Sequence, residues 1–374
     1  MADVVVVGGG IVGTSTLYHL AAAGCRGAVL VERDTLGSGS TAAAAGGIRA
    51  QFSDELNIRI AQEAIARFAR FADEIGVDIG FRQTGYLFLL QAGEVGTFQR
   101  SVALQQSLGV PSRLITPAEA AAIVPQVRVD DLAAATFCPI DGSADPGSAV
   151  QGYAAAARRL GARILQGTPA TGIVVEGDRV VGVTTGRGVI ATPSVVCAAG
   201  VWSRALAATA GVDIPVRAER RYVHLTTEGG DLPAELPLTI DFATGFYFHR
   251  EGPGLLLGGP WAAAEDLAPV ALHRVPALAD LPIRPGWSGD YEVSPDHNAI
   301  VGATASPRGF LYGTGFSGHG FQQGPVVGCY LADLALGREP VLDLAPFSLD
   351  RFAGSGSDAS GDTGPGLRTE ANFV

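Results

Sequence analysis

The sequence predicts an α/β protein whose nucleotide-binding domain is discontinuous along the chain. The first 32 residues read as a strand, a glycine turn, a helix and a second strand that ends in an acid. Beyond them, short apolar strands alternate with helices, and inserted stretches have the alternation of an antiparallel sheet. A chain of 374 residues is long for one hydrophobic core, so we expect two domains.

The opening unit begins with the four valines of residues 4–7, a pattern typical of a strand buried on both faces. In the following glycine turn, Gly8 allows the tight turn, Gly10 leaves room for a pyrophosphate, and Gly13 lets the helix approach the sheet closely. Glu32 follows Gly13 by about 20 residues, where a carboxylate accepts hydrogen bonds from ribose hydroxyls. The unit therefore predicts a dinucleotide site; the alternative is a glycine-rich turn without a ligand.

The amino-acid composition argues against some classes of binding partner and some kinds of catalytic residue. Hydrophobic residues make up 47% of the chain and charged residues 17%, as in a well-buried globular protein. A net charge of −11 argues against nucleic acid or an anionic membrane as a partner. The chain contains no lysine, so neither a Schiff-base lysine nor a lysine general base is available.

No signal segment and no apolar run long enough to cross a bilayer is visible in the sequence. The cysteines form no CxxC pair and no zinc or disulfide pattern. We therefore expect a reduced, cytoplasmic location and no transmembrane segment. The four cysteines are Cys25, Cys138, Cys197 and Cys329.

The remaining elements follow in order. Small residues over 37–49 suggest backbone that passes close to a ligand. We expect helices at 57–75, 97–108, 117–123, 149–160 and 324–336. We expect strands at 85–91, 162–165, 173–183 (a hairpin), 194–202, 217–226, 246–258, 298–302 and 309–313.

This order implies a nucleotide domain made of residues 1–80, 140–215 and 288–353. Residues 81–139 and 216–287 would form a substrate domain with an antiparallel or mixed sheet. Residues 354–374 are rich in Gly, Ser and Asp, and we expect a disordered tail.

Four segments together resemble the D-amino-acid oxidase and sarcosine oxidase family of FAD-dependent amine oxidoreductases. They are the opening unit, residues 39–49, the turn at 199–202, and the C-terminal blocks 291–297 and 313–325. The last block is most similar to the branch of sarcosine, dimethylglycine and proline dehydrogenases. The resemblance implies a Rossmann-like FAD domain of the glutathione-reductase type, a flavin roofed by the second domain's sheet, and oxidation of a C–N bond.

The resemblance makes FAD the expected dinucleotide, although the opening unit alone would suit NAD equally. Backbone N–H groups in the glycine-rich turn at 313–320 would stabilise the negative charge of a reduced flavin. The expected cofactor-binding residues are Gly8, Gly10, Ile11, Val12, Gly13, Glu32, Arg33, Ser40, Thr41, Gly46, Gly47, Ile48, Ala170, Gly200, Trp202, Gly315, Gly318, His319, Gly320, Phe321 and Gln322.

The sequence departs from the family pattern at four positions. Gly289 and Ala43 stand where some relatives carry the cysteine or histidine that binds flavin covalently, so we predict non-covalent FAD. Gln322 and Leu256 stand where monomeric sarcosine oxidases have lysines. Without the cation that promotes reaction with oxygen, a dehydrogenase is favoured over an oxidase.

Five residues are candidates for chemistry: Arg49, Tyr247, His249, His319 and Gln322. Arg49 could bind a substrate carboxylate with its fork, or pair with a nearby acid. His319 could tune the flavin or move a proton, or be held by backbone bonds. Gln322 could bond flavin or substrate, or cap its helix. Tyr247 and His249 could roof the active site, or serve ordinary sheet packing.

The leading hypothesis is an FAD-dependent oxidoreductase that oxidises a small secondary or N-methylated amino acid by hydride transfer. One alternative is a 2-hydroxy-acid dehydrogenase on the same fold. Another is a flavin-binding subunit or assembly factor that depends on partner chains, with an electron-acceptor protein as a possible partner. Histidines with metal-ligand spacing are absent from the sequence, so we predict no metal.

Overall fold

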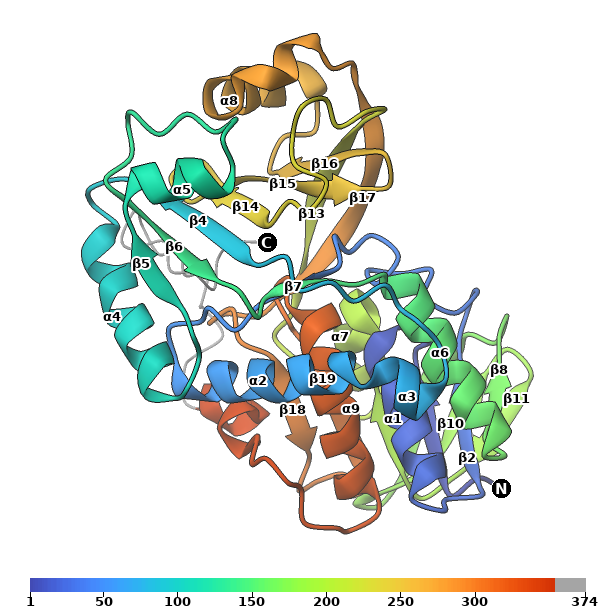
Figure 1. Ribbon diagram of the computed structural model, residues 1–374. Helices are drawn as coiled ribbons and strands as arrows, with labels where there is room; N and C mark the ends of the chain where they lie inside the picture. Colours follow the sequence, from blue (N-terminus) through green and yellow to red (C-terminus); the bar gives the residue numbers. More distant parts are fainter. Residues whose placement is uncertain (354–374) are drawn as a thin grey trace.

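The computed structural model describes residues 1–353 and folds into two lobes (Figure 1). The lower lobe is built on a six-stranded sheet with the order β18-β19-β12-β1-β2-β8. All its neighbouring strands pair in parallel except β18, which is antiparallel to β19. The strands are β1 (Val4–Val7), β2 (Ala28–Val31), β8 (Arg163–Leu165), β12 (Val195–Cys197), β18 (Ile300–Ala303) and β19 (Phe310–Thr314).

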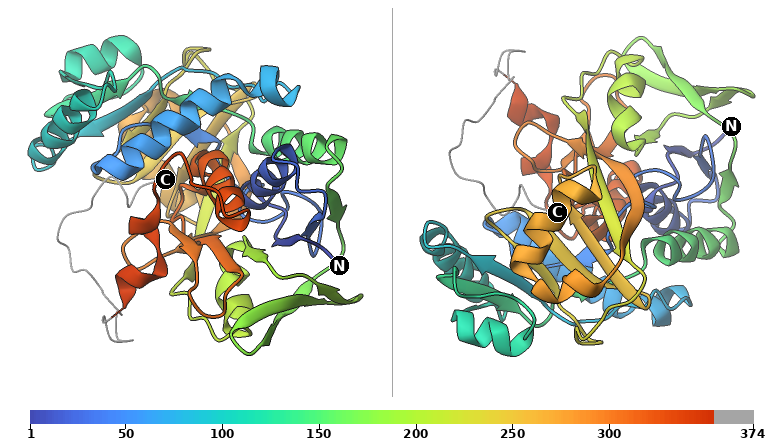
Figure 2. Two further views of the ribbon diagram at one scale, coloured as in Figure 1. Left: turned by 90° about the horizontal axis from the view of Figure 1, so that it is seen from below. Right: turned by 90° about the horizontal axis from the view of Figure 1, so that it is seen from above.

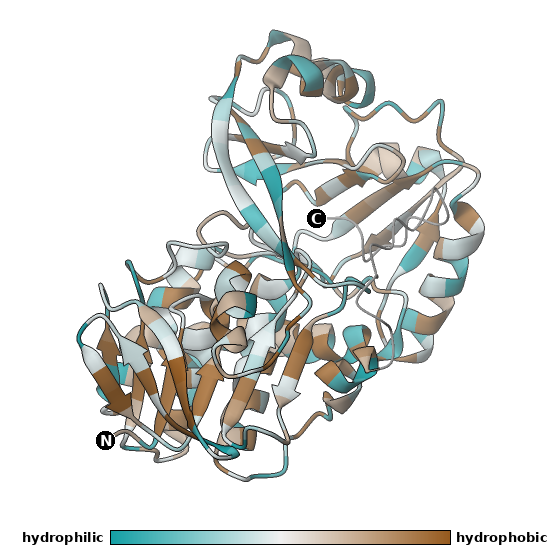
Figure 3. Cartoon of the chain, turned by 180° about the vertical axis from the view of Figure 1, so that it is seen from behind, coloured by the Kyte–Doolittle hydropathy of each residue, from teal (hydrophilic) through white to brown (hydrophobic). Residues whose placement is uncertain are grey.

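The valine run forms the centre of this lobe because both faces of β1 are covered. Val4 and Val6 belong to the core beneath the helices, whereas Val5 and Val7 belong to the core on the opposite face. A side chain alternates between faces along a strand, so an unbroken apolar run is what a doubly covered strand requires. The strands of this sheet accordingly show as hydrophobic in Figure 3.

Helices cover one face of the six-stranded sheet and a small antiparallel sheet covers the other. The helices in contact on the first face are α1 (Ile11–Ala22), α2 (Glu55–Ala69), α6 (Pro146–Arg159) and α9 (Gly320–Ala335). The second face carries β9 (Ala170–Glu176), β10 (Arg179–Thr185), β11 (Gly188–Ala191) and α7 (Ser203–Ala208). This arrangement confirms the predicted α/β class with a Rossmann-like dinucleotide fold.

The upper lobe is built on a mixed eight-stranded sheet with the order β17-β13-β16-β15-β14-β4-β6-β5. Its strands are β4 (Tyr86–Leu90), β5 (Arg113–Ile115), β6 (Ala134–Cys138), β13 (Arg217–Thr226), β14 (Leu238–Asp241), β15 (Phe246–Glu251), β16 (Gly254–Gly259) and β17 (Ile283–Val293). Three helices accompany it: α4 (Val95–Ser107), α5 (Pro117–Ile123) and α8 (Ala264–Arg274).

The two faces of β15 have different surroundings. Phe246 and Phe248 pack into the core beneath α5 and α8. Tyr247 packs on the other face with Tyr86 and Leu256. Alternation along the strand therefore places Tyr247 and His249 on the face that looks away from α8.

β17 and β13 form a long antiparallel pair that reaches from the upper lobe towards the lower one (Figure 1), and the two strands lie side by side in the view from above in Figure 2. Strands of the upper sheet come from residues 86–138 and 217–293, so β17 continues five residues past the predicted boundary at 288. The domain boundaries themselves stay a prediction. The predicted tail at 354–374 lies outside the described residues.

Of the five predicted helices, only 117–123 has the predicted bounds; α4 and α6 begin two and three residues earlier than predicted, and two helices differ more. The predicted helix 57–75 is interrupted at Arg70, which separates α2 from α3 (Phe71–Ile75). The last helix begins at Gly320, not Gly324, and Pro325 lies inside it, where it donates no backbone hydrogen bond. Among residues 1–353, no helix has both the length and the apolar character needed to span a membrane.

Candidate flavin site

A cavity of about 440 Å³ lies where β1, α1, the segment at 38–47 and the end of β17 meet. Its walls come from the glycine turn at residues 8–10, the end of β2, and the turn after β12. The end of β17 contributes Asp290, Tyr291 and Glu292, and the turn before α9 contributes Phe316 and Gly318. A volume of this size lies in the range of small-molecule sites.

The glycine turn is shaped by two close approaches. Gly8 has a φ of 112°, and a Cβ there would meet the carbonyl oxygen of Ala198. At Gly13 a Cβ would lie 1.9 Å from the carbonyl oxygen of Gly8, so only glycine lets α1 start this close to β1. The N-terminus of α1 has Gly10 as its cap and no side-chain capping bond, which leaves N–H groups directed at the cavity.

Glu32 and Thr41 frame this end of the cavity. One carboxylate oxygen of Glu32 accepts a 2.6 Å hydrogen bond from the Gly9 N–H, and the other accepts one from the Asp34 N–H. The Thr41 hydroxyl accepts a bond from the Ile11 N–H. Carboxylate lone pairs beyond these bonds can take ribose hydroxyls, as the sequence predicted.

The turn between β19 and α9 closes the other end of the cavity. Gly315 and Gly318 have positive φ angles of 71° and 100°, and His319 caps α9. The Ser317 hydroxyl donates a hydrogen bond to the Gly315 carbonyl and accepts one from the Ser294 N–H. The turn is thus fixed to the loop that follows β17.

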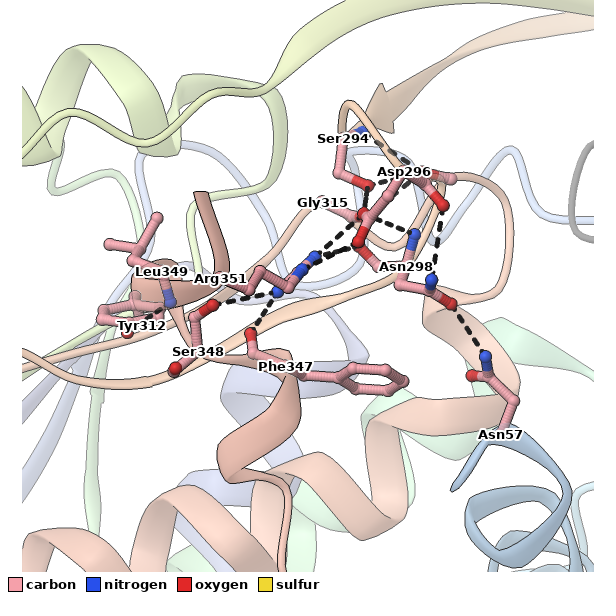
Figure 4. Close-up of polar contacts among 11 residues, drawn as sticks. Asn57, Ser294, Asp296, Asn298, Tyr312, Gly315, Phe347, Ser348, Leu349 and Arg351 are labelled. Carbon is pink, nitrogen blue, oxygen red and sulfur yellow. Dashed lines mark hydrogen bonds and ion pairs between the residues drawn. The ribbon is translucent and has the colours of Figure 1, made fainter. Parts of the chain in front are cut away.

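A polar network behind that loop holds it in place (Figure 4). Arg351 forms an ion pair with Asp296 at 2.8 Å, and it also donates to the Asn298 carbonyl. Asn57, at the start of α2, donates to the Asn298 side chain and accepts from Gln323 of α9. The network joins α2, α9 and the last described residues around the turn between β19 and α9.

Three of the catalytic candidates form one buried cluster behind the cavity wall. The Arg49 N–H donates to the Gln322 Oε1 at 2.8 Å, and the Arg49 guanidinium lies 3.0 Å from the His319 Nε2. The guanidinium also donates to the Gln51 carbonyl and lies over the Phe52 ring. Burial, followed by the Arg49 charge, holds the pKa of His319 well below 6.5, so His319 is neutral.

Tyr247 and His249 lie on the same face of β15 but do not line the cavity. Burial lowers the pKa of His249 to about 4, against a backbone hydrogen bond at Ala45 that acts in the opposite direction. Ala45 itself lines the cavity. The two side chains therefore stand one layer behind the wall, where sheet packing also holds them.

Comparison with known proteins agrees with this geometry. Residues 3–334 match the model of the FAD dependent oxidoreductase family DAO. The chain belongs to this family of flavoenzymes. It is 32% identical over 386 residues to the mitochondrial sarcosine dehydrogenase of Homo sapiens, an alignment that covers 96% of this chain and 42% of that protein. The chain thus spans less than half the length of this curated relative.

Two solved structures share the fold over nearly their whole length. The L-proline dehydrogenase from P. horikoshii superposes with a TM-score of 0.87 and 34% identity, covering 94% of this chain and 97% of that one. The glycine oxidase from Geobacillus kaustophilus superposes with a TM-score of 0.84 and 27% identity, covering 93% and 98%. The predicted family, fold class and cofactor are confirmed.

The cavity fits FAD on observations of this chain alone. The backbone that borders the cavity has glycines at positions where a Cβ would fill the cavity or collide with neighbouring backbone, as at Gly8. The N-terminus of α1 has no side-chain cap and offers N–H groups for a pyrophosphate, and the Glu32 carboxylate in the same wall offers acceptors for ribose hydroxyls.

Most of the predicted FAD contacts meet at this cavity. Those that line it are Gly8, Gly10, Ile11, Val12, Glu32, Arg33, Ser40, Thr41, Gly46, Gly47, Ala170, Gly200, Trp202, Gly318, Gly320 and Phe321. Those that stand behind its wall are Gly13, Ile48, Gly315, His319 and Gln322. Of these, Gly13 acts on the site through the packing of α1.

Sequence reasoning missed Asp290, Tyr291 and Glu292 as cavity residues. They belong to a block that carried the family resemblance, but no local pattern showed which side chains face the cofactor. Tyr86 was not predicted either; it does not line the cavity, but its hydroxyl lies against Gly47, which does, and burial raises the pKa of Tyr86 far above 10.

The two positions considered for covalent flavin attachment meet in space. A Cβ built on Gly289 would lie 2.3 Å from the Ala43 Cβ, and neither residue carries a nucleophile. Trp287 donates its indole N–H to the Ala43 carbonyl and fixes this contact. Within residues 1–353, no three His, Cys, Asp or Glu side chains gather in an arrangement that could hold a metal.

Proposed function

We propose that this flavoenzyme oxidises the C–N bond of a small secondary or N-methylated amino acid to an imine, which water then hydrolyses. The observation that carries the proposal is the buried cluster of Arg49, His319 and Gln322 beside the flavin cavity. The Arg49 guanidinium is complementary to a carboxylate, and so is the Gln322 Nε2, a buried donor that has no hydrogen-bond partner. The named substrates of the relatives, sarcosine and L-proline, are small secondary amino acids and support the same class.

Carboxylate binding at this cluster requires an exchange of partners. The Arg49 guanidinium already contacts the His319 Nε2 and the Gln51 carbonyl. His319 is neutral, because burial and the Arg49 charge keep it unprotonated, and the Arg49 charge also acts on the buried carboxyl group of Asp141. A substrate carboxylate would offer Arg49 a charge-assisted bond of about twice the strength of the neutral contact with His319.

When bound, FAD supplies the two-electron acceptor that takes a hydride from the carbon beside the nitrogen. The chain's own residues orient the substrate and keep water out. Neither His319 nor His249 is a good proton acceptor at neutral pH, because burial lowers the pKa of both. The substrate amine should therefore enter in its neutral form, with its lone pair free to assist the transfer.

We propose that FAD is held without a covalent bond and that electrons leave to an acceptor other than oxygen. Gly289 and Ala43 offer no nucleophile for attachment. Leu256 is fully buried in β16 and carries no charge that would stabilise superoxide. Acid precipitation should release the flavin into the supernatant; flavin that stays with the pellet would contradict the non-covalent proposal.

The decisive experiment is anaerobic mixing of the yellow protein with sarcosine, N,N-dimethylglycine, L-proline, glycine, D-alanine and L-lactate. We expect bleaching of the flavin by one of the first three. Bleaching by lactate alone would support a 2-hydroxy-acid dehydrogenase instead. The absence of bleaching by every compound would favour a flavin-binding subunit that depends on partner chains. Reoxidation should be faster with a dye than with oxygen.

A further inference from the structure

We propose that Glu292 is a cofactor-positioning residue that takes up a proton when FAD fills the cavity, and holds the dinucleotide as a neutral hydrogen-bond donor. This inference rests only on FAD binding, so it does not depend on which substrate the enzyme oxidises. Glu292 lies next to the glycine-rich turn at 313–320 and does not belong to the cluster of Arg49, His319 and Gln322.

The carboxyl group of Glu292 lies in the cavity wall near the end of β17. Its Oε2 accepts a 2.7 Å hydrogen bond from the Thr314 hydroxyl, which also lies 3.2 Å from the Gly200 carbonyl. A Cβ on Gly200 would lie 3.7 Å from the same Oε2. The carboxyl is therefore fixed between β19 and the turn after β12, and its open side faces the space for the cofactor.

No cation among the described residues forms an ion pair with Glu292, although β13, the strand paired with β17, carries several arginines. Arg220 pairs with Asp290 at 2.7 Å. Arg217 and Arg221 both pair with Glu219. The positive charges beside β17 are thus shared among other acids, and Glu292 keeps a carboxyl without a counter-charge.

The remaining titratable groups around Glu292 do not supply a charge either. On β12, burial raises the pKa of the Cys197 thiol to about 11. On β17, burial raises the pKa of Tyr291 to about 12. Beyond the turn, the pKa of His319 is lowered by burial, and so is that of His297 in the following loop. At pH 7 to 9 all four groups are neutral.

Burial also acts on Glu292 itself and raises its pKa to about 7, although the Thr314 hydroxyl and the N–H groups of Gly315 and Phe316 favour the charged form. FAD brings a negatively charged pyrophosphate and displaces water from the cavity. Both changes penalise a carboxylate and favour its protonated form. The proton uptake then follows from linkage between the two equilibria.

The direction in which pH changes FAD affinity follows from this proton uptake. Below pH 7, Glu292 is already protonated and FAD affinity should not depend on it. Above pH 7, a proton must bind with each FAD, so the Kd should rise by up to about tenfold per pH unit. The Glu292→Gln variant keeps a neutral donor of the same shape, and its Kd should stay near the low-pH value of the wild type.

The test compares FAD titrations of the apoprotein by flavin fluorescence between pH 6 and 9 in the wild type, Glu292→Gln and Glu219→Gln. Glu219 is the matched control, because it is an ion-paired carboxylate on β13 outside the cavity wall. We expect the wild type and Glu219→Gln to share the slope above pH 7 and Glu292→Gln to lose it. Equal slopes in all three would overturn the proposal.

A second measurement uses the holoenzyme and does not require the apoprotein. In an infrared difference spectrum at pH 8, wild type minus Glu292→Gln should show the C=O stretch of a protonated carboxyl. A band of an ionised carboxylate in its place would refute the proposal. If Glu292→Gln fails to fold, proton uptake by the wild type on FAD addition in weak buffer decides, with about one proton expected at pH 8 and none if the proposal is wrong.

Discussion

Gly13→Ala tests whether the contact between α1 and β1 builds the phosphate end of the site. The new Cβ would lie 1.9 Å from the Gly8 carbonyl oxygen, which is backbone and cannot rotate away. Relief to an ordinary contact requires α1 to move by more than about 1 Å, and overpacking of this kind typically costs about 1–3 kcal/mol. Because α1 carries the N–H groups at the cavity, the same shift should raise the FAD Kd at least tenfold.

The assay for Gly13→Ala is urea unfolding of the apoprotein, followed by FAD titration. Gly96→Ala is the matched control: Gly96 lies in α4, where a Cβ would meet only the end of the Arg100 side chain. That change should stabilise the protein by about 0.5–1 kcal/mol and leave the FAD Kd unchanged. A Gly13→Ala protein with wild-type stability and FAD affinity would refute the close-packing argument.

Three further changes test other parts of the molecule. Arg274→Ala removes a buried guanidinium that pairs with Asp241 and Asp131, and urea unfolding should show a loss of about 3–5 kcal/mol; a loss below 1 kcal/mol would contradict it. Arg49→Lys keeps the positive charge but loses the two-pronged guanidinium geometry, so steady-state kinetics should show a KM for the amino acid raised about tenfold or more. An unchanged KM would show that Arg49 does not bind the substrate. His249→Asn should make the protein less sensitive to acid. Burial lowers the folded-state pKa of His249 to about 4, so the stability that the wild type has above pH 6.5 is lost as the pH falls towards 4. Identical melting curves of the two proteins over this pH range would show that His249 does not contribute to the acid sensitivity.

Local patterns were sufficient for the opening unit. Its strand, glycines, helix and Glu32 lie within a few turns of one another, and each residue type is required by a nearby backbone contact. The strand β13 and the helix α5 were also predicted with the bounds they have. These elements follow from short-range periodicity and capping, as the box formed by Thr116 and Glu119 shows.

Contacts between distant segments could not be read in the same way. Glu292 faces the cavity because β17 pairs with β13 some 70 residues earlier, and this register is set by tertiary packing. Arg49 reaches His319, a residue 270 positions away, which no local sequence pattern indicated. The break at Arg70 also has no local Gly or Pro to announce it.

The position of β19 and α9 at the late end of the chain has a consequence for biogenesis. β1 and α1 emerge from the ribosome before the turn that completes the cavity, which lies beyond residue 313. About 300 residues separate the two parts of the wall, so the turn before α9 must be synthesised before FAD meets a finished site. Until then the core face of α1 that α9 covers is open, and a nascent chain should depend on shielding of this apolar surface. FAD can then complete the site only on a chain in which β19 and the turn before α9 have already joined the sheet.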